Sequence, residues 1–247
     1  MIQRLVAALA LTLGLAACDP VVVAPADPLP PQKGGGPVAV TPALAGPQPD
    51  RSQGRAFVAV VDRLEPVAER VCRQQAPRLN CDFRIVIDDT PGAPPNAFQT
   101  VDRTGRPVIV FTPALIALTR NPDEIAFVMA HEAAHHIEDH LSQQQRNATL
   151  GAIVFGQLAG ATGAGQDGIR DAQQLGAAVG LRSYSQEFEL EADRLGTIIT
   201  ARAGYDPLVG ADFFFRLPDP ASRFLSTHPP NAERYAAVRR VAAELGY

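Results

Sequence analysis

The sequence predicts an α+β domain that is mostly helical and holds one small β-sheet. Apolar residues recur at helical spacing over residues 55–74. Residues 81–112 then alternate apolar with polar side chains and are rich in β-branched residues, as strands are. Helical patterns return near residue 113 and continue to the end of the chain. Strands gathered in one stretch between helices favour the α+β class over a regular alternation of strand and helix.

The first 54 residues are expected to lie outside this domain. Residues 1–17 combine an early cation with an apolar run that is too short to cross a bilayer, which is typical of a signal peptide. The run ends in Leu-Ala-Ala-Cys, which resembles a bacterial lipobox, so we expect lipid on Cys18 and attachment to a membrane. The alternative is an ordinary signal peptide whose cleavage site neighbours a cysteine.

Residues 18–54 are rich in proline and contain the run KGGG, with almost no periodic apolar pattern. Such a segment cannot bury enough apolar surface to offset its ordering entropy, so we expect a disordered tether. A lipidated chain of this kind would face the periplasm in a bacterial cell envelope. The sequence leaves open whether the inner or the outer membrane carries the lipid.

Residues 55–247 are long enough for one domain with its own core. The formal net charge of −4 and the scattered Lys and Arg residues argue against nucleic acid as a partner. Two cysteines remain in the domain, Cys72 and Cys81, and an even pair in an exported protein predicts a disulfide. Two unpaired buried thiols are the alternative, because sequence spacing does not establish bridging geometry.

Local signals place the first elements of the domain. The helix over 55–74 contains Pro66, where we expect a break or a kink. One strand is expected over 81–88, where β-branched residues alternate with polar ones. Two more are expected over 97–112, on either side of the turn DRTGR.

Helices are expected after the strands, near 113–119, from Asn121 to His140, over 183–204, from Asp206 through Phe213, Phe214 and Phe215, and from about 230 to 245. The second of these has the strongest start signal, with Asn121 as N-cap and Pro122 at the first helical position. Gly204 is placed to end the third at its C-terminus. Residues 148–181 are dominated by Ala and Gly and are interpreted as loosely packed helical pieces or a mobile flap.

The stretch HEAAHHIEDH holds four of the five histidines of the chain. Side chains four apart on a helix share a face, so His131 and His135 are expected to bind one metal ion. On a continuous helix His136 and His140 point about 140° and 180° away from His131 and cannot reach that ion. Two neutral imidazoles suit zinc, which acidifies water, and Glu132 on the adjoining edge is placed to act as general base.

A third metal ligand is expected from a second helix. Glu189 and Asp193 stand four apart on one face, so Glu189 can bind zinc while Asp193 hydrogen-bonds a ligand histidine. Gly196 shares that face and would let the two helices approach closely. The neighbouring Glu187 and Glu191 are interpreted as a solvated face.

Four stretches, in the order HEAAHHIEDH, SYSQEFELEADRLG, ARAGYDP and FLSTHPPNAERY, resemble the zinc metallopeptidases of family M48, above all its soluble periplasmic or lipoprotein bacterial members. The resemblance covers about residues 95–240. It implies a gluzincin fold in which the HExxH helix packs against an ExxxD helix, one zinc ion per chain, and protein or peptide substrates. By this likeness the matching positions are the zinc ligands His131, His135 and Glu189, the general base Glu132, and the aspartate Asp193. His140 matches a histidine that recurs in the family and is interpreted as structural.

His228 lies in STHPPNAER, just before the last expected helix, and family members have a His-Pro here followed by an arginine, in this chain Arg234. Peptide hydrolysis passes through an oxyanion, and a donor aimed at it stabilises the transition state. Either His228 or Arg234 could supply that donor. In a resting state His228 could instead occupy the open metal position and exclude water.

These observations together predict a membrane-anchored zinc metalloendopeptidase that hydrolyses peptide bonds in unfolded or misassembled cell-envelope proteins. Such an enzyme would serve quality control. The alternative is a non-proteolytic, zinc-containing assembly factor or chaperone of the envelope. A purely structural zinc site has no need of Glu132, which argues against that alternative.

Overall fold

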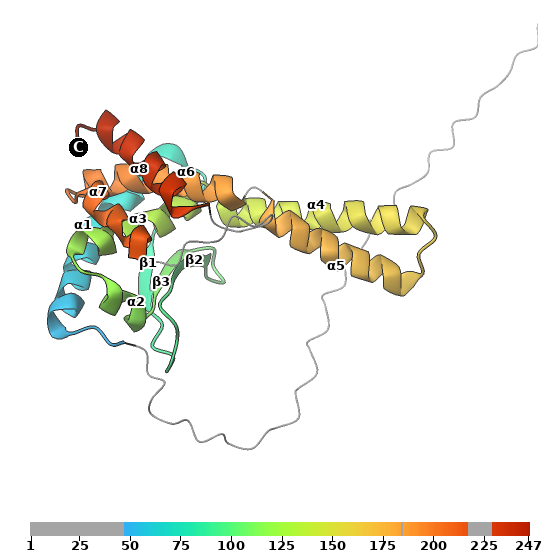
Figure 1. Cartoon of the computed structure of the whole chain (residues 1–247), viewed down its shortest axis with the longest axis horizontal. Coiled ribbons are helices and arrows are strands. Elements are labelled where there is room, and N and C mark those ends of the chain that lie inside the picture. The colour runs from blue at the N-terminus through green and yellow to red at the C-terminus, as the bar shows by residue number, and fades with distance from the viewer. Residues whose placement is uncertain (1–46, 184, 217–228) are drawn as a thin grey trace, which may run out of the picture. The chain divides into compact units, whose positions relative to one another are not determined.

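The computed structural model describes residues 47–183, 185–216 and 229–247. The predicted signal peptide, Cys18, most of the predicted tether and His228 lie outside these residues. The described part is mostly helical with one three-stranded sheet, so the predicted α+β class is confirmed (Figure 1).

The first helix, α1 (Arg51–Gln75), begins four residues before the predicted start at residue 55. Asp50 caps it, because its carboxylate accepts hydrogen bonds from the backbone amides of Ser52 and Gln53 at 2.7 and 2.8 Å. Pro66 lies inside the helix and does not end it, so of the predicted break or kink the break is wrong.

The sheet has the order β1-β3-β2 and consists of β1 (Arg84–Ile87), β2 (Ala97–Val101) and β3 (Pro107–Phe111). β3 lies in the centre, parallel to β1 and antiparallel to β2, and all five of its residues are buried. The hairpin that the turn DRTGR predicted is therefore present between β2 and β3. Gly105 in this turn has a φ of 80°, which favours glycine.

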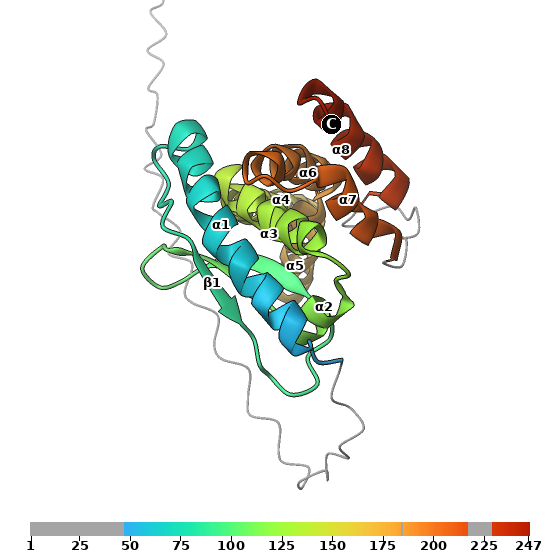
Figure 2. The ribbon, with the colours of Figure 1, turned by 90° about the vertical axis from the view of Figure 1, so that its left-hand side faces the viewer.

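The helix α3 (Pro122–Ile137) lies at the centre of the helical layer and follows the short helix α2 (Pro113–Leu118). It begins as predicted, since the Asn121 side chain accepts a hydrogen bond from the Glu124 amide at 2.9 Å. Helices on both sides and the sheet cover it, so most of its residues are buried (Figure 2). The motif HExxH is thus held on the most enclosed helix of the domain.

The prediction that α3 continues to His140 is wrong. The helix ends at Ile137, and Asp139 adopts the left-handed conformation with a φ of 56°, which Asp tolerates better than most residues. A new helix, α4 (His140–Ala161), then starts in a different direction. The angular positions expected on one continuous helix therefore do not apply to His140.

α4 and α5 (Gln166–Arg182) form a helical hairpin and pack mainly against each other (Figure 1). Glycines at their contact let the two backbones come close: a Cβ on Gly151 would lie 2.0 Å from the carbonyl oxygen of Gly176. The Ala- and Gly-rich stretch is therefore a pair of closely packed helices, rather than loosely packed pieces.

The remaining helices are α6 (Ser185–Arg202), α7 (Pro207–Ala211), the 3₁₀ helix η2 (Asp212–Arg216) and α8 (Asn231–Glu244). α6 packs against α3 and α8, and Gly204 beyond its end has a φ of 78°. Cys72 near the end of α1 is joined by a disulfide to Cys81, which precedes β1. Among the described residues, no helix combines the length and the apolar character that a membrane span requires.

Candidate active site

α3 and α6 bring three potential metal ligands together, His131, His135 and Glu189. The Nε2 atoms of the two histidines lie 3.1 Å apart, and the Glu189 carboxylate oxygens lie 3.5 Å from His131 Nε2 and 3.4 Å from His135 Nε2. Donors at 2.0–2.1 Å from a tetrahedral zinc ion are separated by about 3.3 Å, so this set fits zinc in chemistry and in spacing. Within the described parts of the chain, no other group of three such side chains meets this closely.

Gly196 of α6 allows the two ligand helices to approach. A Cβ at this position would lie 3.1 Å from the backbone nitrogen and 3.2 Å from the Cα of His131. These contacts are tight and involve backbone, which cannot rotate away. A residue without a side chain here therefore sets the spacing between Glu189 and the two histidines.

Behind His131, a buried ion pair links α6 to α8. Asp193 Oδ1 lies 2.9 Å from His131 Nδ1, and Arg234 donates from Nε to Asp193 Oδ2 at 2.8 Å and from Nη2 to Oδ1 at 2.7 Å. Arg234 also stacks on Phe214, with its Cζ 3.8 Å from the ring centroid. A carboxylate at Nδ1 holds the proton of His131 on that nitrogen, which leaves Nε2 free to bind a metal ion.

The charges around His131 favour a cation. Burial lowers the pKa of His131, but the hydrogen bonds to Asp193 and Glu189 outweigh it and raise that pKa to about 9. Burial also raises the pKa of Asp193, yet the charge of Arg234 and the bond to His131 leave it below its ordinary value. Carboxylates that draw a proton onto His131 in this way equally favour a metal ion at the same place.

Glu132 lies beside a small cavity next to the ligands. Burial raises the pKa of its carboxyl to about 7, while a backbone hydrogen bond from Gln99 of β2 works in the opposite direction. A carboxyl group with a pKa near neutrality can both take up and release a proton, which suits a general base that later acts as an acid. The cavity has a volume of about 140 Å³ and is lined by Pro95, Asn96, Ala97, Leu115, Val128, His131, Glu132, Phe213, Phe214 and Arg234.

His135 also has side-chain partners on the side away from the metal position, and the sequence did not predict them. His140 Nδ1 lies 2.9 Å from His135 Nδ1, and His140 Nε2 lies 3.0 Å from Glu191 Oε2. Phe188 stacks on the His140 ring at a centroid distance of 4.5 Å. If His140 donates from Nε2 to Glu191, its Nδ1 accepts the proton of His135 Nδ1, and His135 Nε2 is left free for the metal.

Two expectations are corrected by this arrangement. His140 was expected to point away from the site, and Glu191 was interpreted as part of a solvated face. The turn at Asp139 brings His140 back against His135, and Glu191 is only partly exposed and contacts His140. The signal that could have found Glu191 is its spacing two residues after Glu189, but that spacing alone also fits a solvent-facing residue.

His136 takes no part in the site. It is buried on the opposite side of α3, where its Nε2 donates to the carbonyl oxygen of Asn80 at 2.7 Å and its ring meets Phe83 edge to face. Of the four histidines in HEAAHHIEDH, two thus face the metal position, one stands behind a ligand and one belongs to the core.

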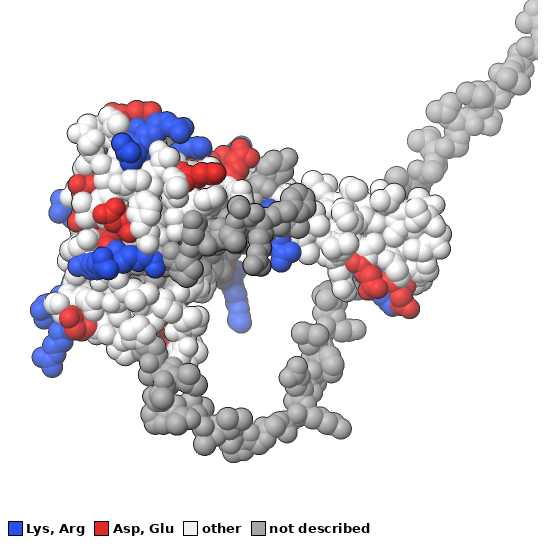
Figure 3. Space-filling view, viewed as in Figure 1, with Lys and Arg blue, Asp and Glu red and all other residues white. Residues whose placement is uncertain are grey.

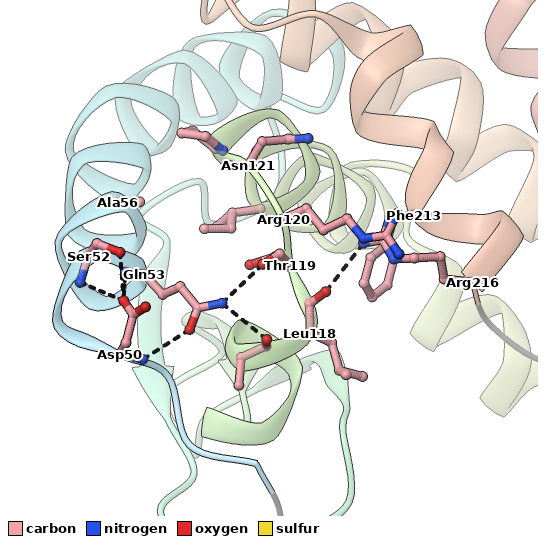
Figure 4. Close-up of a pocket in the computed structure, with 13 residues that line it drawn as sticks. Asp50, Ser52, Gln53, Ala56, Leu118, Thr119, Arg120, Asn121, Phe213 and Arg216 are labelled. Atoms are coloured by element: carbon pink, nitrogen blue, oxygen red, sulfur yellow. Dashed lines mark hydrogen bonds between the residues drawn. The ribbon is translucent and has the colours of Figure 1, made fainter.

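A cavity of about 780 Å³ lies away from these ligands, between the start of α1, the α2–α3 connection and η2 (Figure 4). Gln53 spans it and donates to the carbonyl oxygens of Ala117 and Thr119, both at 3.1 Å. Arg216 closes it from the other side by donating to Leu118 and to the buried Glu124. These contacts join structural elements to one another, so this cavity is assigned no chemical role.

The sequence profile of "Peptidase family M48" matches residues 60–242. The chain is 33% identical over 150 residues to the beta-barrel assembly-enhancing protease of Escherichia coli O157:H7. This matched region covers 56% of this chain and 31% of that protein. It is 36% identical over 118 residues to the putative beta-barrel assembly-enhancing protease of Vibrio cholerae, covering 45% of this chain and 24% of the other. It is also 31% identical over 163 residues to the mitochondrial metalloendopeptidase OMA1 of Saccharomyces cerevisiae, covering 62% and 45%. The chain therefore spans less than half the length of these relatives.

Proposed function

This chain belongs to peptidase family M48, and we propose that it is a membrane-anchored zinc metalloendopeptidase acting on unfolded or misassembled cell-envelope proteins. The observation that carries the proposal is the convergence of His131, His135 and Glu189 beside Glu132. A metal-binding triad and an adjacent base are the minimum that hydrolysis of a peptide bond by a zinc enzyme requires.

The proposed zinc ligands are His131, His135 and Glu189, with one position left open. When bound, zinc acidifies a water molecule and polarises the carbonyl group of the substrate. Asp193 and His140 hold the Nδ1 atoms of the two histidines, so both imidazoles present Nε2 in a fixed direction. The ligands are thus oriented before any metal arrives.

Glu132 is proposed as the proton carrier. Its carboxylate takes a proton from the attacking water and later passes it to the nitrogen of the leaving amine. Burial raises the pKa of its carboxyl above the usual value, which favours uptake of a proton from the water. The rival role, that of a non-proteolytic assembly factor, gives no function to a carboxyl group at this position.

The substrate is proposed to bind as an extended strand along β2. Within the described residues β2 pairs with β3 alone, so its other edge offers backbone donors and acceptors. Gln99 of β2 reaches Glu132 through its backbone amide, which places this strand beside the base. Recognition through the backbone reads little of the side-chain sequence, which suits an enzyme that acts on many unfolded chains.

Arg234 and His228 remain the proposed donors to the oxyanion. Arg234 lines the cavity beside Glu132, although two of its nitrogens already hold Asp193. His228 is proposed to plug the metal position when no substrate is bound.

The lipid on Cys18 is proposed to keep the enzyme at a membrane of the bacterial envelope, facing the periplasm. The names of two relatives, a beta-barrel assembly-enhancing protease and a mitochondrial metalloendopeptidase, support a proteolytic role.

The test is cleavage of an unfolded protein such as reduced casein by wild type, two site variants and one control variant. We expect chelator-sensitive cleavage by wild type, retained zinc without turnover in Glu132→Gln, and loss of both zinc and turnover in His131→Ala. Glu187→Gln, which changes an exposed carboxylate on α6, is the matched control and should behave as wild type. Full activity of Glu132→Gln would overturn the mechanism, and a wild-type protein that binds zinc without cleaving any unfolded substrate would favour the assembly factor.

A further inference from the structure

The outer face of α4 carries a stripe of exposed, large apolar side chains. Its four residues, here called the α4 stripe, and their exposed fractions are Leu150 (60%), Ile153 (46%), Val154 (58%) and Leu158 (63%). They follow one another at intervals of three, one and four residues, which places them on one face of a helix. A soluble helix usually presents polar side chains on the face that no other element covers.

Another face of α4 packs against α5. Gly151 and Gly156 lie on the side that packs against α5, where Cβ atoms would collide with Gly176 and Gln173. α4 is therefore apolar on two faces, of which α5 covers only one. Interfaces in which small residues let two helices approach this closely are typical of helix pairs in membranes.

Charge is distributed unevenly over the hairpin. No residue from Asn147 to Gln166 is charged, so the second half of α4 and the turn after it have no charged side chain. The charged residues near the tip, Asp167, Arg170 and Asp171, belong to α5. Figure 3 shows this contrast: near the tip of the hairpin, charged atoms lie along the α5 side, whereas the α4 side shows none.

A lipid surface fits these features better than a protein partner does. Protein interfaces surround an apolar centre with a polar and charged rim. The α4 stripe has polar neighbours in its own helix, such as Arg146 and Gln157, but no charged residue follows Arg146 up to the end of α4. The proposed lipid on Cys18 also keeps a membrane within reach. The 31 residues between Cys18 and Asp50 span at most about 110 Å even when fully extended.

We propose that the α4 stripe docks into the boundary between headgroups and acyl chains of the membrane that carries the lipid anchor. α4 lies parallel to the surface, as amphipathic interfacial helices do, and α5 with its charges stays on the water side. The inference rests on the proposed anchoring at Cys18, but not on proteolysis. Because α4 starts at His140, which contacts the ligand His135, docking holds the active site close to the membrane surface.

The first experiment measures binding to vesicles of phosphatidylethanolamine and phosphatidylglycerol. It uses the mature chain from residue 18 with Cys18→Ser, so that no lipid is attached. We expect this protein to float with the vesicles, and the addition of Val154→Ser and Leu158→Ser to weaken its partition at least about tenfold. The matched control is Val58→Ser with Leu245→Ser, which removes an exposed Val and an exposed Leu elsewhere and should leave binding unchanged.

A second measurement reports the depth of insertion. The sequence contains no tryptophan, so Leu158→Trp introduces a single fluorophore in the stripe. Its emission should shift to the blue with vesicles and be quenched by brominated acyl chains, whereas Leu245→Trp should show neither effect. Cleavage of casein without vesicles should be unchanged in all these variants, so a failure of docking is distinguishable from a failure of the enzyme.

Two results would overturn the proposal. In the first, the unlipidated protein does not bind vesicles. In the second, it binds, but the stripe and control variants bind equally well. If the first result is accompanied by loss of self-association in the stripe variant, or by loss of the capture of unfolded casein by Glu132→Gln, the α4 stripe is assigned to a second copy of the chain or to the substrate.

Discussion

Arg234 of α8 donates two hydrogen bonds to Asp193 of α6, from Nε at 2.8 Å and from Nη2 at 2.7 Å. Asp193 in turn contacts His131. Asp193 is completely buried and Arg234 nearly so. The helix α8 therefore takes part in orienting His131, a proposed metal ligand that lies about a hundred residues earlier in the sequence.

Replacement of Arg234 by Ala should leave the buried Asp193 carboxylate without its arginine partner. We expect the free energy of unfolding to fall by about 3–5 kcal/mol, because the buried Asp193 loses both hydrogen bonds from Arg234 and keeps only its contact with His131. Arg234→Lys keeps the charge but not the two-pronged geometry, so its loss should be smaller. Urea denaturation measures both, and Arg239→Ala, at an exposed position on the same helix, is the control. Equal stability of Arg234→Ala and Arg239→Ala would show that the pair contributes nothing.

His140 and Glu191 should act as positioning residues for His135. We expect His140→Ala to lower zinc affinity by about 10–100-fold, since partners of metal-bound histidines have effects of this size. Glu191→Gln should change the affinity in the same direction and by less, because the amide oxygen can still accept a hydrogen bond. Competition with a chromophoric chelator gives the affinities, and Glu187→Gln serves as the exposed control. Unaltered zinc affinity in His140→Ala would reduce this contact to simple packing.

Gly196→Ala should disturb the contact between α3 and α6. Its Cβ would meet the backbone of His131 at 3.1–3.2 Å, so we expect a loss of about 1–3 kcal/mol despite the better helix propensity of Ala. Zinc affinity should fall as well. Gly54→Ala in α1 is the matched control, because its Cβ meets nothing within 4 Å and should stabilise the helix by up to about 1 kcal/mol. A Gly196→Ala protein as stable as Gly54→Ala would contradict the close packing.

His136 should make stability depend on pH below neutrality. Burial lowers its pKa in the folded protein from the usual 6.5, so the unfolded chain binds the proton more readily. The stabilisation is present above about pH 6.5 and is lost as the pH falls, by up to about 1.4 kcal/mol per pH unit. The measurement is the difference in unfolding free energy between metal-free wild type and His136→Gln, taken from about pH 7 to about pH 5. A difference that stays constant with pH would show that His136 does not resist protonation.

The Cys72–Cys81 disulfide closes a short loop, so its effect on stability should be moderate. We expect the double variant Cys72→Ser, Cys81→Ser to lose about 2–3 kcal/mol of unfolding free energy. Thiol labelling of the denatured, unreduced mature protein is the direct check and should find neither cysteine free. Labelling of both would contradict the bridge.

Much of the fold was predictable because its signals are local. Asn121 and Pro122 predicted the start of α3, and the turn DRTGR predicted the β2–β3 hairpin, since caps and turns depend on a few neighbouring residues. The pairing of His131 with His135 follows from the pitch of one helix. The choice of Glu189 as their companion needed only a second helix with a carboxylate on the correct face.

The tertiary structure decided what lies behind those ligands. A single residue in the left-handed conformation, Asp139, redirects the chain and brings His140 and then Glu191 to His135, which no helical periodicity predicts. Arg234 reaches Asp193 only because α8 packs on α6. Helical spacing determines which side chains of one element share a face, whereas contacts between elements depend on where the chain turns and on which faces are buried together.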